Sequence, residues 1–171
     1  VAFTATDVKG IYDPTSATRT ITVKSTSPEI TQEQYKWSLK YVDSQELSGL
    51  GKDGINRYHP ASYAFDRDPS TIWHTEYFVN KPNVPHDIQI DLGVVYAIDT
   101  FVYVPRQDGG VNGRIKKYEF YVSMDGVNWG SSVATGSFAN NNLEQEVGFW
   151  PKKGRFIRLR ALSETNSLPF T

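Results

Sequence analysis

The chain has 171 residues, a formal net charge of −1 and no cysteine, and 13% of its residues are aromatic. This length suits one domain with a short additional piece, and a mean hydropathy of −0.46 indicates a soluble protein with no apolar run of membrane-spanning length. The balanced charge without a basic run argues against nucleic-acid binding, and the lack of cysteine excludes disulfides, cysteine-ligated zinc and thiol nucleophiles.

Residues 1–30 contain two strand-like segments, VAFTATD and TRTITVKS, around a polar turn. Two strands cannot bury a face by themselves. They are either the closing hairpin of a bacterial immunoglobulin-like module, with residues 24–30 as a linker, or an N-terminal hairpin packed on the main domain. Both interpretations stay open. Val1 opens a strand-like run instead of a signal peptide, so we expect the chain to be a piece of a longer protein.

The remainder, residues 31–171, shows the alternation of apolar and polar residues that is typical of β-strands. No segment carries an apolar stripe at helical spacing over a useful length. Short strands separated by turn residues predict an all-β, antiparallel sandwich or barrel. The segments that we expect to be strands are Lys36–Val42, His86–Gly93, Thr100–Val104, Tyr118–Gly126 and Arg155–Leu162.

The segment Gly49–Gly54, GLGKDG, matches the glycine spacing of dinucleotide-binding motifs. That motif requires a buried strand before it and a helix after it. The following residues, INRYHPAS, do not predict a helix, so we interpret the segment as a flexible loop.

The segment AFDRDPSTIWHTEYF, residues 64–78, combines acidic, hydroxyl and aromatic side chains. Asp66, Asp68 and Thr71 have the spacing at which oxygens can converge on a hard cation such as Ca²⁺ in a tight loop. Alternatively, Asp66 and Ser70 cap backbone amides in a proline-containing turn. The spacing alone favours the turn.

Catalysis finds little support in the sequence. His59, His74 and His86 fit no zinc-protease motif, there is no nucleophile-elbow motif, and no pair of carboxylates can be placed across a cleft. We therefore predict that the chain is not an enzyme.

Aromatic side chains at two places suggest different roles. Trp73 is expected in the core. Tyr77 and Phe78 lead into a loop rich in proline and asparagine, where exposed rings can stack on sugars, although burial in the core is the commoner fate of an aromatic residue.

The segment Pro105–Ile115 is a glycine-rich turn that carries Arg106, Asn112 and Arg114. It is either a plain hairpin loop with solvated arginines or a source of guanidinium and amide donors for ligand hydroxyls.

Four segments, in this order, resemble the discoidin or coagulation factor 5/8 type C fold. They are ASYAFDRDPSTIWHTEYF, PHDIQIDLG, YVPRQDGGVNGRIKKYEFYVSMDGVNWG and RFIRLRALSE. Within that fold they are most similar to family 32 carbohydrate-binding modules of bacterial glycan-degrading enzymes. The resemblance covers about residues 34–171 and implies an antiparallel jelly-roll β-sandwich.

The resemblance also implies one structural Ca²⁺. By carry-over, its ligands are Asp66, Asp68 and Thr71, joined by the main-chain carbonyl of Tyr63. The metal thus becomes the favoured interpretation of this loop. Members of the family continue with a closing strand that often brings a glutamate to the metal, and we expect that final strand to be missing from this sequence.

Four residues correspond to the sugar-binding positions of galactose-binding members: His74, Tyr77, Arg106 and Asn112. The resemblance implies that a ring stacks on the sugar while the other side chains bind its hydroxyls. Many members carry a glutamate where Arg57 lies, and a positive charge there would favour an acidic sugar.

The function implied is non-catalytic carbohydrate binding, which targets a larger secreted bacterial protein to galactose-type or acidic-sugar glycans. The expected location is extracellular or at the cell surface, with flanking domains of the same polypeptide as neighbours. The alternative is an adhesion or structural module that binds protein or membrane, for which Tyr77, Phe78 and Val79 would be the apolar loop tip. A membrane partner is the less favoured of these.

Overall fold

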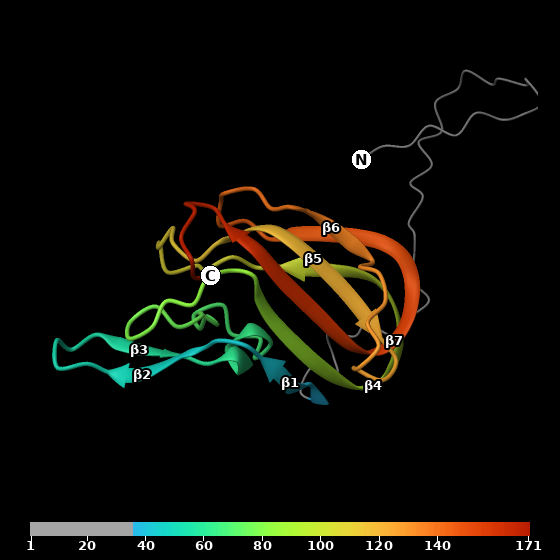
Figure 1. The fold of residues 1–171 in the computed structure, drawn as a ribbon, viewed down its shortest axis with the longest axis horizontal. Helices are drawn as coiled ribbons and strands as arrows, with labels where there is room; N and C mark the ends of the chain where they lie inside the picture. The colour runs from blue at the N-terminus through green and yellow to red at the C-terminus, as the bar shows by residue number, and fades with distance from the viewer. Residues whose placement is uncertain (1–35) are drawn as a thin grey trace, which may run out of the picture.

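The protein is described by a computed structural model that covers residues 36–171. The predictions for residues 1–30 lie outside the described residues. The regular structure of the described part consists almost entirely of antiparallel strands, which are joined by long loops (Figure 1). The elements are β1 (Ser38–Val42), β2 (Glu46–Leu50), β3 (Asn56–His59), the 3-10 helix η2 (Ala61–Ala64), β4 (His86–Tyr103), β5 (Ile115–Ser123), β6 (Ala134–Ser137) and β7 (Gln145–Glu164).

The strands β1-β4-β7-β5-β6 form a five-stranded sheet in this order, and β2 and β3 pair separately. The strands β4 and β7 have 18 and 20 residues, and they curve around the body of the domain (Figure 1). Their curvature wraps one sheet around a common core, which is the sandwich that the sequence predicts.

The alternation of apolar and polar residues along β4 and β7 explains how these strands turn one face toward the core. Ile88, Ile90 and Leu92 are buried, and Ile90 pairs in register with Ile157 of β7. On the opposite face, Asp87 forms an ion pair with Arg158. The two paired side chains are only 12% and 23% exposed, so their attraction mainly offsets the cost of burying the charges, and the apolar face supplies the hydrophobic stabilisation.

The strand β4 continues past the point where the sequence predicts its end. We expected two strands, His86–Gly93 and Thr100–Val104, but the ladder with β7 resumes at Tyr96 after an irregularity that begins at Asp91. Gly93 has φ +83°, which turns the chain without ending the pairing.

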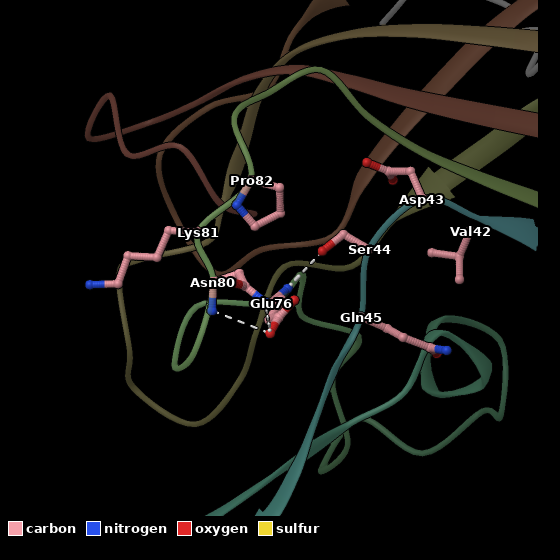
Figure 2. A pocket seen from close by; sticks show the side chains of 8 residues that line it. All are labelled: Val42, Asp43, Ser44, Gln45, Glu76, Asn80, Lys81 and Pro82. Atoms are coloured by element: carbon pink, nitrogen blue, oxygen red, sulfur yellow. Dashed lines mark hydrogen bonds between the residues drawn. The ribbon is translucent and has the colours of Figure 1, made fainter.

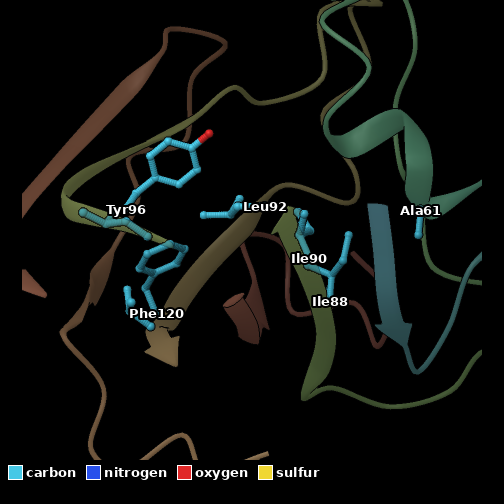
Figure 3. Packing of buried hydrophobic residues seen from close by; sticks show 8 residues of the cluster. Ala61, Ile88, Ile90, Leu92, Tyr96 and Phe120 are labelled. Carbon is cyan, nitrogen blue, oxygen red and sulfur yellow. The ribbon is translucent and has the colours of Figure 1, made fainter. Parts of the chain in front are cut away.

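The core consists of aliphatic residues of β4 packed against aromatic residues of β5. Figure 3 shows Ile88, Ile90, Leu92 and Tyr96 gathered near Phe120. A second cluster is aromatic, and its members stack closely, as in the pair Tyr118–Phe138 with ring centroids 4.1 Å apart. Trp73 packs against the first cluster, as predicted, and its indole N–H donates to the Ser44 carbonyl at 3.1 Å.

The segment interpreted as a flexible loop, Gly49–Gly54, is instead part of the hairpin formed by β2 and β3. The amide of Gly51 donates to the Ile55 carbonyl at 2.9 Å, and Gly54, with φ +77°, makes the turn. This hairpin projects from one end of the sandwich (left in Figure 1). Within residues 36–171, no helix is long and apolar enough to cross a membrane.

Candidate functional site

Loops at the end of the sandwich that carries the β2–β3 hairpin bring distant residues together. The ring of Tyr77 lies 4.5 Å from that of His74, 6.4 Å from that of His59 and 6.1 Å from that of Phe170, measured between centroids. These four rings come from β3, from the loop that precedes β4 and from the C-terminal segment. We call this group the aromatic platform.

His74 is held as a neutral ring with a defined tautomer. Its Nδ1 lies 2.7 Å from the Thr75 carbonyl, which can only accept, so Nδ1 carries the proton. The side chain is buried, and burial lowers the pKa of His74 to about 4. At neutral pH, Nε2 is therefore a hydrogen-bond acceptor suited to a ligand hydroxyl.

Gly113 leaves room beside that acceptor. A Cβ atom at this position would lie 2.7 Å from Nε2 of His74, and its φ of +83° also favours glycine. The β4–β5 loop thus approaches His74 with backbone alone.

Arg106 lies near His59. Burial is the main cause of the lowered pKa of His59, and the positive charge of Arg106 lowers it further. Its Nε donates to Asp108 at 2.7 Å, and its Nη1 donates to the carbonyl of Asn112 at 2.7 Å. These bonds fix the plane of the guanidinium and leave further N–H groups of the fork for a ligand.

Asn112 is exposed beside Arg106, and its side-chain Oδ1 accepts a hydrogen bond from Asn166 at 3.3 Å. Of the five predicted sugar-binding residues, His74, Tyr77 and Arg106 thus form one group, to which Asn112 is joined.

Arg57 lies at the edge of this group and is already paired. Both terminal nitrogens donate to the carboxylate of Asp53, and the guanidinium stacks 4.1 Å from the ring centroid of Phe78. The positive charge that we expected to face an acidic sugar is compensated within the hairpin.

Two buried carboxylates support the site, and sequence reasoning did not identify them. Glu46 accepts the backbone amides of Tyr77 and Phe78, both at 3.0 Å. Burial raises the pKa of Glu46, but the hydrogen bonds from Ser48, Tyr77 and Phe78 outweigh it and lower the pKa overall.

The second carboxylate, Glu164, joins the β4–β5 loop to the C-terminal segment. It accepts the amides of Gly113 and Leu168, both at 3.1 Å, and that of Asn166. The sequence offered no signal for Glu46 and Glu164, because their partners lie far along the chain or in irregular segments. Phe170 and His59 were also missed, since neither belongs to a recognisable motif.

The loop predicted to bind Ca²⁺ has the geometry of a capped turn. The amide of Asp68 donates to Asp66 at 2.9 Å, and both the amide and the hydroxyl of Ser70 donate to the Asp68 carboxylate. Thr71 Oγ1 nevertheless lies 2.7 Å from Asp66 Oδ2 and 2.9 Å from the Asp68 carbonyl oxygen.

Three oxygens of the kind that Ca²⁺ prefers therefore lie close together in this loop and could supply part of the six to eight ligands that the cation takes. Asp68 would contribute its carbonyl, because its carboxylate is turned toward Ser70. Tyr63 is half-buried in η2, and its amide donates to the Pro60 carbonyl. Among residues 36–171, no three carboxylate or imidazole side chains converge as a metal site, so carbonyl and hydroxyl oxygens would have to complete the ligand set.

A separate hollow of about 580 Å³ lies between residues 42–45 and the loop of residues 76–82 (Figure 2). It has no aromatic ring in its lining and therefore offers no stacking surface for a sugar. Its lining residues are Val42, Asp43, Ser44, Gln45, Glu76, Asn80, Lys81 and Pro82.

Comparison with known proteins identifies the family. Residues 44–171 match the F5/8 type C domain model. The chain belongs to the F5/8 type C domain family. This confirms the resemblance and the fold class inferred from the sequence.

Relatives of this F5/8 type C domain include enzymes that are much longer than it. A galactose oxidase of Gibberella zeae is 39% identical over 120 residues, which are 70% of this chain and 18% of that protein. A sialidase of Micromonospora viridifaciens is 38% identical over 133 residues, which are 77% of this chain and 19% of that protein. The chain thus spans less than one fifth of the length of these two relatives.

Solved structures of family 32 carbohydrate-binding modules superpose on the F5/8 type C domain. A Clostridium perfringens module in complex with GalNAc-β-1,3-galactose has 29% identity and a TM-score of 0.69, covering 81% of this chain and 92% of that one. Another module from C. perfringens, in complex with galactose, has 27% identity and a TM-score of 0.66, covering 81% and 90%.

Proposed function

We propose that this F5/8 type C domain is a non-catalytic module that binds galactose-type glycans at the aromatic platform. The observation that carries the proposal is the combination of the Tyr77 ring with the neutral acceptor of His74 and the oriented donors of Arg106. A ring binds the apolar face of a pyranose, while an acceptor and a charged donor bind its hydroxyls. Relatives in complex with galactose or GalNAc-β-1,3-galactose support this choice of sugar.

The domain would hold a longer extracellular or cell-surface protein near its glycan. One shallow site gives weak affinity, because hydroxyls exchange water for protein contacts with little net gain. Linkage to other binding domains would then add avidity. The short share of its relatives that this chain spans is consistent with such an arrangement.

Calorimetric titration with galactose, N-acetylgalactosamine and galacturonic acid tests this proposal. We expect the neutral galactose-type sugars to bind, and Arg106→Ala and Tyr77→Ala to lose binding while the melting temperature changes little. A charged hydrogen bond is worth about 1.5–3 kcal/mol, which corresponds to about a tenfold to hundredfold loss of affinity. Binding that persists in both variants would place the site elsewhere.

Acidic sugars are the alternative ligand class, and the pairing of Arg57 with Asp53 weighs against them. The acidic-sugar hypothesis would be correct if galacturonic acid bound more tightly than galactose and Arg57→Glu abolished that preference.

A membrane or protein-binding role is favoured by one observation only. Phe78 and Val79 are 52% and 71% exposed at the loop tip. Flotation with liposomes separates this function from glycan binding, since a carbohydrate-binding module stays unbound.

Hydrolysis of chromogenic galactosides by the purified chain would refute the non-catalytic assignment.

We further propose that the loop of residues 66–71 binds one structural Ca²⁺ through Asp66, the Asp68 carbonyl and Thr71, with the Tyr63 carbonyl as an additional ligand. The convergence of the Asp66, Asp68 and Thr71 oxygens supports this proposal. The cation would supply a fixed positive charge that holds these oxygens together.

A further inference from the structure

Phe78 and Arg57 form a supported aromatic surface next to the aromatic platform. The Arg57 guanidinium lies 4.1 Å from the centroid of the Phe78 ring and covers one of its faces. Phe78 is still 52% exposed, so much of the residue remains open to solvent although Arg57 covers the ring from one side. An exposed ring held from behind by a cation resembles a stacking surface more than a residue of the core.

Arg57 is fixed in place by the hairpin. The residue is only 7% exposed, Nη1 donates to Asp53 at 2.9 Å and to the Ile55 carbonyl at 3.2 Å, and Nη2 also donates to Asp53. A Cβ atom at Gly51 would lie 2.3 Å from Nη1 and 2.5 Å from Oδ1 of Asp53, so a larger residue there would displace the Arg57–Asp53 pair. These contacts use the charge of Arg57 internally and make the residue a rigid support.

The strand β3 places this surface in line with the platform. Arg57 and His59 are two residues apart, so their side chains lie on the same face of the strand, about 7 Å apart. His59 stacks on Tyr77, and Arg57 stacks on Phe78. Glu46 accepts the amides of both Tyr77 and Phe78, so one buried carboxylate holds the backbone from which the two rings project.

We propose that Phe78, supported by Arg57, forms a second subsite that stacks on a neutral sugar adjoining the one bound at Tyr77. This inference rests on the proposed function. It assigns the ligand as a disaccharide or longer oligosaccharide, in which the first sugar is galactose-type and the second presents an apolar face to Phe78. Arg57 is then a positioning residue, and its charge does not select the ligand.

The test is the ratio of affinities for a neutral β-linked galactosyl disaccharide and for the matching monosaccharide, measured by calorimetry. In the unaltered chain we expect the disaccharide to bind about three- to tenfold more tightly, as one stacking contact predicts. Phe78→Ala should reduce this ratio to about one. The matched control is Val79→Ala, which removes an exposed apolar side chain of the same loop and should preserve the ratio.

Arg57→Lys separates support from charge, because it retains the charge and loses the planar surface. We expect this variant also to lower the ratio, with an unchanged far-UV circular dichroism spectrum. A ratio that Phe78→Ala leaves intact overturns the second subsite, as does a stronger preference for a uronate-containing disaccharide that Arg57→Lys retains. Failure of the unaltered chain to bind any monosaccharide would refute the proposed function instead.

Discussion

At the scale of single residues, the protonation state of His74 controls whether the site offers an acceptor. Its neutral form is favoured above a pKa of about 4, compared with an ordinary value of 6.5. Affinity for galactose should therefore be constant from pH 7 to pH 5 and fall as the pH drops through about 4. Protonation would convert Nε2 into a donor in a site that already contains the Arg106 cation.

NMR titration of the His74 imidazole, alongside calorimetry over the same pH range, checks this prediction. Burial is the main cause of the shift, and the charges of Arg106 and His59 act in the same direction. The hydrogen bond to the Thr75 carbonyl and the charge of Glu46 oppose it. An affinity that begins to fall near pH 6.5 would mean that His74 titrates like an exposed histidine.

Gly113 is a second residue on which galactose binding depends, because it determines the space beside His74. We expect Gly113→Ala to abolish detectable galactose binding, because the added methyl group would occupy the space at Nε2 of His74. It should also destabilise the fold by about 1 kcal/mol, since φ is positive there.

The control is Gly130→Ala, at a glycine with φ +60° and no atom near the position of a Cβ. It carries a similar backbone penalty and should bind galactose normally in the same calorimetric assay. Equal affinity of the two variants would show that Gly113 matters only for backbone conformation.

At the scale of elements, Glu164 fixes the β4–β5 loop and the C-terminal segment to each other. Glu164→Gln keeps the shape of the side chain but replaces charged hydrogen bonds to Gly113, Asn166 and Leu168 with weaker or mismatched ones. We expect a stability loss of about 1–3 kcal/mol in chemical denaturation.

A purely structural role of Glu164 would leave the folded protein's affinity unchanged well below its melting temperature. We expect a loss of about tenfold there instead, because Gly113 and Phe170 would no longer be held against His74. Wild-type affinity of the folded Glu164→Gln protein would therefore contradict a positioning role.

The elements differ in how well the sequence predicted them. His86–Gly93 alternates strictly and lies in β4, where Ile88, Ile90 and Leu92 are buried. Arg155–Leu162 lies in β7, where Ala161 is buried and Ile157 and Leu159 pack partly buried against the core. The continuity of β4 was not predictable, since the pairing across Gly93 depends on β7, which comes more than 50 residues later. Local composition predicted that the strand ends at Gly93, but the pairing with β7 continues the strand beyond that residue.

The residues of the site also differ in how well the sequence predicted them. A family motif identified His74, Tyr77 and Arg106, and the structure brings them together. The supporting contacts of Glu46 and Glu164 reach residues 31 and 51 positions away, and no local pattern encodes such distances. The pairing of Arg57 with Asp53 was equally hidden, because the hairpin that creates it was interpreted as a loop.

At the scale of the whole molecule, Ca²⁺ binding should be visible as stability. A cation that binds only the folded state raises the melting temperature by mass action. We expect EDTA to lower the melting temperature of the unaltered chain, and excess Ca²⁺ to restore it. Scanning calorimetry with and without the chelator makes the measurement.

Asp66→Ala is the control for this prediction, because it removes an oxygen that contacts Thr71. The variant should melt at the same temperature with and without EDTA. If the unaltered chain is equally insensitive, the loop is only a capped turn, and the Asp66, Asp68 and Thr71 hydrogen bonds account for its shape.

The place of β7 in the sheet has a consequence for how the domain is synthesised. β7 lies between β4 and β5, although it is the last strand of the described chain to be translated. Until it emerges from the ribosome, β1 and β4 can form only one two-stranded piece, and β5 and β6 another, and such pieces are marginally stable in water. The edges of β4 and β5 that later pair with β7 therefore stay unpaired during translation. In this state the nascent domain is most prone to aggregation and to binding by chaperones.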